Sequence, residues 1–217
     1  MADALTLYDY WRSSSAYRVR IALNLKGLEY HQVPVHLVRD GGQQNSPAYR
    51  KINPLGLVPA LAHGERVVVQ SLAICEYLEE AVEAIPLLPA DPAGRARVRG
   101  MVQTICSEVQ PLNNLSVMQY LKGEMSVSDE LYALWYGHWI ARGFSAVEAW
   151  LQGPASGGFC HGDAPGLADC FLVPQVYNAE RFSCDLEPYP RIREITDRCR
   201  AMDPFAKAAP ERQQDAE

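Results

Sequence analysis

The stretch that decides the fold is Ser13-Ser14-Ser15-Ala16-Tyr17-Arg18-Val19-Arg20-Ile21-Ala22-Leu23. Its three serines offer the side-chain oxygens that cap a helix, and apolar residues recur after them at helical spacing. A β-prone run, Leu5 to Tyr8, comes just before, and Gly27 stands where a helix C-cap belongs. The stretch therefore predicts a strand followed by a helix at the start of a mixed α/β domain.

The rest of the N-terminal third continues this alternation of short elements. We expect a strand at 30–36, a short helix at 46–51 and a hairpin made of 58–61 and 66–69. Ser71 is expected to cap a further helix that runs to about Val82. The resulting βαβαββα order is typical of a small mixed α/β domain.

The composition of the sequence changes at the proline-rich stretch 86–92, which predicts an interdomain linker. Beyond it the patterns are helical and no strand is expected. We expect helices at 93–121, 128–151, 167–180 and 192–202, and a polar, frayed tail after Pro210. The sequence thus predicts an α/β domain over 1–85, a linker over 86–92 and an all-helical domain over 93–217.

The composition is that of an ordinary globular protein, with 217 residues, 48% hydrophobic and 21% charged. A net charge of -6 argues against nucleic-acid or membrane-surface partners, so an anionic ligand would need a locally basic site. The sequence has no signal-peptide pattern and no apolar run of membrane length, which predicts a cytoplasmic protein. Its six widely spaced cysteines predict free thiols and no metal site.

The opening stretch closely resembles the active-site motif of the zeta-class glutathione transferases, Ser-Ser-Cys-x-x-Arg-Val-Arg-Ile-Ala-Leu. Further strings match this family in order and spacing, at 40–44, 53–54, 58–59, 70–74, 110–112, 114–117, 173–176, 178–182 and 185–186. The resemblance covers nearly the whole chain. It implies a thioredoxin-like N-terminal domain, an all-helical C-terminal domain and a homodimer. The family is that of maleylacetoacetate isomerase, which acts in phenylalanine and tyrosine breakdown.

The resemblance implies a glutathione-dependent cis–trans isomerase with a small dicarboxylate substrate. A cis double bond conjugated to a carbonyl isomerises when a thiolate adds reversibly, because the resulting single bond rotates before elimination. A helix N-terminus lowers the pKa of a thiol placed there. We expect Ser14 to contact the glutathione sulfur, with Ser13 and Ser15 as further candidates, while at least one serine caps the helix. Ser15 replaces the family's cysteine; we still expect activity, because glutathione supplies the nucleophile.

The remaining site residues follow from the family positions. Val58 and Pro59 fit a cis-proline site for the cysteinyl part of glutathione, Gln70 and Ser71 suit the γ-glutamyl carboxylate, and Gln44 is a candidate for the glycyl end. In the helical half the resemblance assigns Gln110, Asn114 and Ser116 to the glutathione and substrate region, and Arg181 to a substrate carboxylate. Arg12 and Arg18 are candidates for added positive potential, although a solvated or ion-paired surface role is an equal alternative.

Two other positions concern the stability of the helical domain and not the chemistry. Gly166 stands where the family has a capping threonine, and Asp169 is expected to be a buried capping or fold-determining carboxylate. Three other functions stay open. They are a maleylpyruvate isomerase, a transferase or dehalogenase acting on small α-halo acids, and a non-catalytic glutathione-binding protein. Only the serine at position 15 supports the last of these.

Overall fold

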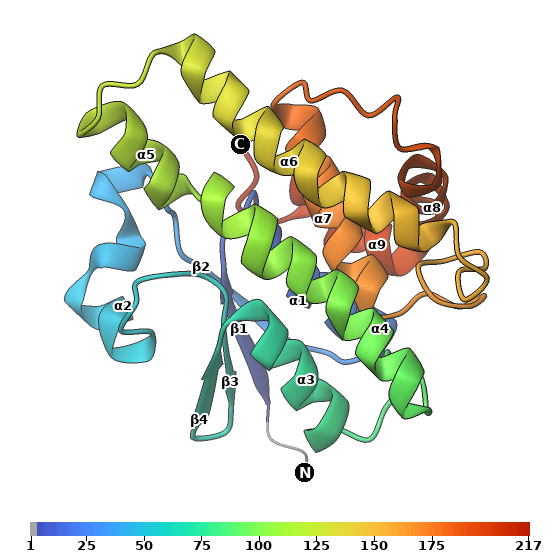
Figure 1. Ribbon diagram of the computed structural model, residues 1–217. Coiled ribbons are helices and arrows are strands. Elements are labelled where there is room, and N and C mark those ends of the chain that lie inside the picture. The colour runs from blue at the N-terminus through green and yellow to red at the C-terminus, as the bar shows by residue number, and fades with distance from the viewer. Residues whose placement is uncertain (1–3) are drawn as a thin grey trace. The chain divides into compact units, whose positions relative to one another are not determined.

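The computed structural model describes residues 4–217 and confirms the expected order of elements in the N-terminal third (Figure 1). A mixed sheet has the strand order β2-β1-β3-β4, in which β1 pairs parallel with β2 and antiparallel with β3. The N-terminal elements, in chain order, are β1 (Leu5–Asp9), α1 (Ser14–Leu25), β2 (His31–Pro34), η1 (Arg39–Gly41), η2 (Gln43–Asn45), α2 (Pro47–Ile52), β3 (Ala60–His63), β4 (Arg66–Val69) and α3 (Ser71–Ala81). This is the thioredoxin-like arrangement.

Helices cover both faces of the sheet. Leu5 and Leu7 of β1 are buried on one face, and α3 packs against β3, β4 and α1 on that side. Tyr8 points the other way, because side chains alternate along a strand. Its ring meets Tyr49 of α2 edge-on, with 6.2 Å between the ring centroids. The sheet therefore lies between α2 and the pair of α1 and α3 (Figure 1).

The turn between β1 and α1 is held by Arg20, whose side chain is completely buried. Its Nη1 donates to the carboxylate of Asp9 at 2.8 Å, and its Nη2 donates to the carbonyl of Trp11 at 2.8 Å. Its Nε donates to the carbonyl of Ala208 at 3.0 Å. Because the donors of a guanidinium are fixed in one plane, this single side chain fixes the turn from which α1 begins.

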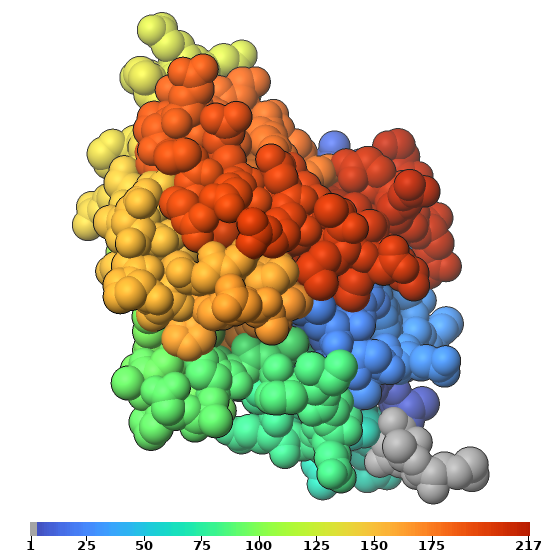
Figure 2. Space-filling model, turned by 90° about the vertical axis from the view of Figure 1, so that its right-hand side faces the viewer, coloured from blue at the N-terminus to red at the C-terminus, as the bar shows by residue number. Residues whose placement is uncertain are grey.

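The C-terminal residues belong to the N-terminal unit, which comprises residues up to Leu87 together with Ala201–Glu217. The sequence placed 201–217 in the helical domain and predicted a frayed end, and the fraying prediction was wrong. Helix α9 (Asp203–Ala208) packs against α1, and the 3-10 turn η5 (Pro210–Arg212) follows it. The deep-red C-terminal residues lie against blue N-terminal ones in Figure 2.

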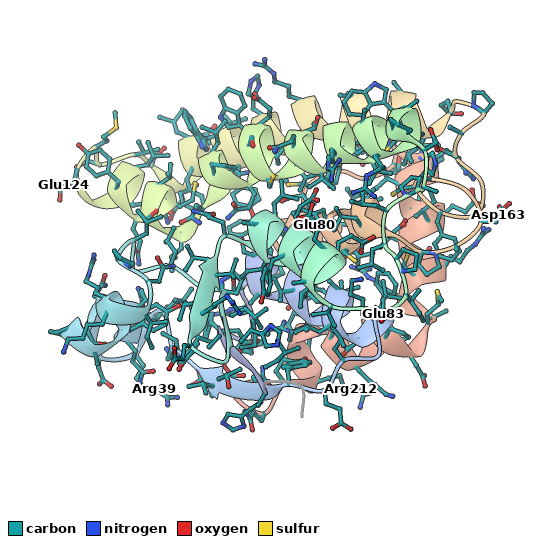
Figure 3. The ribbon with its side chains drawn as sticks, turned by 90° about the horizontal axis from the view of Figure 1, so that it is seen from below. Arg39, Glu80, Glu83, Glu124, Asp163 and Arg212 are labelled. Atoms are coloured by element: carbon teal, nitrogen blue, oxygen red, sulfur yellow. The ribbon has the colours of Figure 1, made fainter. Side chains whose placement is uncertain are left out.

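Specific side-chain partners hold this C-terminal segment. The carboxylate of Asp215 accepts the amide hydrogen of Trp11 at 3.1 Å. Glu217 pairs with the guanidinium of Arg39, which projects outward from η1 (Figure 3). His36 lies 3.5 Å from the same carboxylate. Polar residues that look like a solvated tail in sequence are thus bonded to residues about two hundred positions away.

The second unit, Leu88–Arg200, is helical throughout its regular structure. Helix α7 (Leu167–Arg181) is buried along nearly its whole length, and α4 (Pro92–Gln103) and α8 (Pro190–Arg200) pack against it. The long helix α6 (Asp129–Leu151), which Ser128 caps, packs against α8. Within residues 4–217, no helix is both long enough and apolar enough to cross a membrane.

The single helix expected over 93–121 was wrong. After α4 the chain passes through a π-helical segment, η3 (Thr104–Val109), and a 3-10 turn, η4 (Gln110–Asn113), before α5 (Leu115–Gly123). Pro111 lacks the amide hydrogen that an α-helix requires there, and the side chain of Asn114 caps α5 instead. The π-segment also packs closely: a Cβ added to Gly143 of α6 would lie 2.1 Å from a methyl carbon of Val109.

Candidate functional site

The start of α1 presents unused hydrogen-bond donors. Ser13 is the N-cap, and its Oγ accepts the amide hydrogen of Ala16 at 3.2 Å, which confirms that one serine caps the helix. Ser14 and Ser15 are the first two helical residues, and their amides precede the first intrahelical bond. In the described chain neither amide has a recorded acceptor. Ser14 is buried and Ser15 half-buried, so this helix start offers two amides and two hydroxyls where an anion is favoured.

The start of α3 is built differently. Gln70 has a φ of 73°, a conformation that costs a residue with a side chain roughly 1–3 kcal/mol, and no side chain caps the helix. Ser71 is the first helical residue, so the expectation that it caps α3 was wrong. Its Oγ accepts a hydrogen bond from Nη1 of Arg18 at 3.2 Å. Arg18 is only 1% exposed, which also overturns its alternative assignment to the surface.

The segment before Pro59 is pinned by two side chains. The Val58–Pro59 peptide bond is cis, as the sequence predicts. The carbonyl of Leu57 accepts hydrogen bonds from Nδ2 of Asn53 at 2.7 Å and from the hydroxyl of Tyr49 at 2.8 Å. Both bonds fix the backbone immediately before the proline.

Gln44 and Arg12 both make side-chain contacts within the protein. The Nε2 of Gln44 donates to the carbonyl of Leu37 at 3.1 Å, while its Oε1 is buried and has no partner within residues 4–217. Such an acceptor is normally satisfied by water or a ligand. The guanidinium of Arg12 stacks 4.8 Å from the ring centroid of Trp11, two residues before the buried Ser14.

The second unit carries the other predicted site residues, and each is described within that unit. Gln110 opens η4 and is half-buried. Asn114 and Ser116 bond to each other, because Oδ1 of Asn114 accepts both the amide and the hydroxyl of Ser116 at 3.0 and 2.9 Å. Arg181 ends α7 and is exposed, 5.6 Å from the ring of Phe182, with no carboxylate recorded beside it in the described part of the chain.

The protein's buried thiols are poor candidates for the nucleophile. All six cysteines are free, and the most deeply buried ones include Cys75 on α3 and Cys160. Burial raises the pKa of Cys75 to about 12 and raises the pKa of Cys160 well above its usual value. Both therefore stay protonated near neutral pH. Among residues 4–217 no cluster of three His, Cys, Asp or Glu side chains is arranged to hold a metal ion.

Comparison with known proteins places these features in a family. Residues 3–80 match the model of the glutathione S-transferase N-terminal domain. The chain is 48% identical to a probable maleylacetoacetate isomerase of Vibrio cholerae, over 98% of this chain and 99% of that protein. A bacterial zeta-class glutathione transferase solved as holo maleylpyruvate isomerase superposes with a TM-score of 0.94 at 44% identity, covering 98% of this chain and 100% of that one. The chain belongs to the zeta class of glutathione transferases.

A further relative of known structure carries a ligand. A maleylacetoacetate isomerase from Anaeromyxobacter dehalogenans 2CP-1, with glutathione bound in its active site, has a TM-score of 0.87 and 45% identity to this chain. The match covers 100% of this chain and 99% of that protein.

Sequence reasoning missed several residues that shape this zeta-class site. Arg20 holds the turn before α1, and Asn53 and Tyr49 hold the segment before Pro59. The one hint in the sequence was the pair of arginines in the motif, Arg18 and Arg20. The hydrogen-bond partners of Arg20, Asn53 and Tyr49 lie on the backbone or far away in the sequence, so the sequence pattern does not reveal them. Asp169 was placed correctly. It is 1% exposed and accepts the amides of Cys160 and Gly166 at 3.0 and 2.8 Å.

Proposed function

We propose that this chain is a glutathione-dependent isomerase that converts maleylacetoacetate to fumarylacetoacetate. The observation that carries the proposal is the start of α1, where Ser14 and Ser15 offer two amides with no recorded acceptor beside two hydroxyls. Near-full-length similarity to proteins named for this reaction supports it.

The residues fit glutathione from end to end. The start of α1 receives the sulfur, with Ser14 as the hydroxyl donor. The start of α3, with Gln70 and Ser71, receives the γ-glutamyl carboxylate. The backbone of Val58, next to Pro59, pairs with the cysteinyl part. The buried Oε1 of Gln44, which lacks a partner in residues 4–217, accepts an N–H group near the glycyl end.

The chemistry depends on a thiolate that the protein itself does not provide. When bound, glutathione supplies a thiolate that adds reversibly to the conjugated double bond, so that the carbon–carbon bond rotates before elimination. The helix N-terminus and the Ser14 hydroxyl keep that sulfur ionised. Ser15 cannot act as a thiol, and the buried Cys75 stays protonated. Activity therefore does not require the cysteine that other zeta-class motifs carry.

The substrate is a dicarboxylate, and Arg181 is its main cationic partner. Its planar guanidinium can take a carboxylate through two parallel hydrogen bonds. Arg12 adds positive potential beside the serines, and Gln110, Asn114 and Ser116 supply polar contacts. Arg181→Ala is expected to raise KM for maleylacetoacetate far more than KM for glutathione. Equal increases for both would remove Arg181 from the substrate site.

The experiment is a parallel assay of the purified protein on maleylacetoacetate and maleylpyruvate, followed spectroscopically with and without glutathione. We expect turnover of maleylacetoacetate that depends on glutathione. Maleylpyruvate isomerase is the second candidate, because a structure with that activity in its name has a TM-score of 0.94. A higher kcat/KM for maleylpyruvate would select it. Glutathione binding without turnover of either substrate would refute both.

We propose a cytoplasmic homodimer that acts in phenylalanine and tyrosine breakdown. Six free thiols suit a reducing compartment, and the zeta-class relationship supports the dimer and the pathway. Sedimentation equilibrium tests the oligomeric state: a mass that stays at 24.2 kDa at micromolar concentration would contradict the dimer.

A further inference from the structure

Arg18 is a buried cation in direct contact with a residue of the proposed glutathione site. It lies in the second turn of α1, yet its Nη1 donates to Oγ of Ser71, the first residue of α3, at 3.2 Å. Arg18 is 1% exposed and Ser71 6% exposed, so water does not screen this contact as it screens a surface pair. The two residues are 53 positions apart in the chain.

The chemistry of the two groups fixes the direction of their hydrogen bond. A guanidinium can only donate, whereas a hydroxyl has one donor hydrogen and two acceptor lone pairs. Ser71 therefore accepts from Arg18 and keeps its own hydrogen available. Because Arg18 cannot take that hydrogen, the hydroxyl is left ready to donate to an acceptor such as a carboxylate.

We propose that Arg18 is a positioning residue for the γ-glutamyl carboxylate: it holds the Ser71 hydroxyl as a donor toward that group and places a buried positive charge behind it. The proposal rests on the function proposed above, in which Ser71 contacts this carboxylate. Arg18 thus acts through Ser71 and not on the substrate, which replaces its predicted role as a substrate-binding residue.

A purely structural bond between α1 and α3 makes a different prediction. Loss of a structural bond would lower stability and weaken every glutathione-like ligand equally. Loss of a positioning residue weakens only ligands that carry the γ-glutamyl carboxylate. A pair of ligands that differ in this one group separates the two roles.

The test measures Kd by titration calorimetry for S-methylglutathione and for S-methyl-γ-aminobutyryl-cysteinylglycine, which lacks the carboxylate. Arg18→Met should raise Kd for S-methylglutathione about tenfold, the effect of one charge-assisted hydrogen bond, and leave the second ligand nearly unchanged. Arg66→Met is the matched control, because it removes an exposed cation from the same unit. It should change neither Kd.

Two further variants keep the test decisive. In a Ser71→Ala background, Arg18→Met should lose most of its effect, because the two residues act on one bond. If Arg18→Met fails to fold, Arg18→Lys keeps the charge without the same planar donors and should show the same selective loss to a smaller degree.

The outcomes separate this inference from the proposed function. Equal losses for both ligands in Arg18→Met, or no loss for either, would overturn the role of Arg18 alone. A wild-type protein that binds both ligands equally would overturn the assignment of the carboxylate to α3 and the role of Arg18 with it. A wild-type protein that binds neither ligand would overturn the proposed function as a whole.

Discussion

The starts of α1 and α3 are two helix N-termini in one unit, and they offer an anion different groups. At α1 the buried Arg20 is paired with Asp9 and bonds the preceding turn, so the helix start itself offers an anion amides and hydroxyls. At α3 a buried guanidinium, Arg18, touches the first helical residue. In the proposed reaction the sulfur loses its negative charge when it adds to the double bond and regains it on elimination, whereas the carboxylate keeps its charge throughout.

This difference teaches where each site should influence catalysis. An interaction equally strong in the ground state and the transition state lowers KM without raising kcat. The α3 end should therefore govern affinity for glutathione. The α1 end should govern kcat, because its interactions with the sulfur change during the reaction.

The largest effect, a loss of stability, is expected when Arg20 no longer holds the turn before α1. Arg20→Met leaves the carboxylate of Asp9 buried without its cation, which should lower the free energy of unfolding by about 3–5 kcal/mol. Urea denaturation measures the loss. The double variant Asp9→Asn/Arg20→Met should recover part of it. A loss no larger than that of Arg66→Met would contradict the structural role of Arg20.

The next effect concerns the sulfur itself. Ser14→Ala should lower kcat about 100-fold near neutral pH, because loss of the hydroxyl donor raises the pKa of the sulfur and leaves less of it ionised, with KM for glutathione little changed. Ser13→Ala should instead cost about 1 kcal/mol of stability through the lost cap and reduce kcat far less. Ser15→Cys should keep kcat near that of the wild type. Near-normal turnover in Ser14→Ala would remove this serine from the thiolate site.

At the α3 end, Ser71→Ala should raise KM for glutathione about tenfold, the cost of one hydrogen bond to a charged group. Its kcat at saturating glutathione should change far less than that of Ser14→Ala. Steady-state kinetics with varied glutathione measure both constants. A fall confined to kcat would erase the proposed distinction between the two helix starts.

The smallest effect tests the backbone at the α3 end. Gln70→Gly should raise the free energy of unfolding by about 1 kcal/mol, because glycine adopts a φ of 73° without steric strain. Thermal unfolding gives the change. Asp40→Gly is the matched control: Asp40, with a φ of 56°, lies in the left-handed region that Asp tolerates, so its gain should be smaller. Destabilisation by Gln70→Gly would show that the side chain outweighs the strain.

Local features were predictable from the sequence, and long-range ones were not. A serine cap at the start of α1, the order of strands and helices and the cis Val58–Pro59 bond depend on neighbouring residues or on a recognisable motif. The break in the long helix was missed because apolar spacing continues past Pro111. The bond from Arg18 to Ser71 joins two helices and leaves no trace in either helix's own pattern.

For the candidate site, the sequence identified residue types and the structure supplied their partners. The roles of Ser14, Gln44 and Gln70 as ligand contacts stay predictions. The structure gives the position of the Ser14 amide, the burial of the Gln44 Oε1 and the backbone conformation of Gln70. Arg18 shows the limit most clearly. Its charge was noticed, but burial and partner depend on packing between elements far apart in sequence.

The return of Ala201–Glu217 to the N-terminal unit has a consequence for biosynthesis. The ribosome makes the strands of the sheet first, but α9, which covers α1, comes almost last. Leu88–Arg200 must be translated in between, which takes on the order of 10 s at bacterial or eukaryotic rates. Throughout that interval the nascent sheet domain exposes the apolar side of α1. Its folding can be completed only at the end of translation, when Asp215 reaches the amide of Trp11.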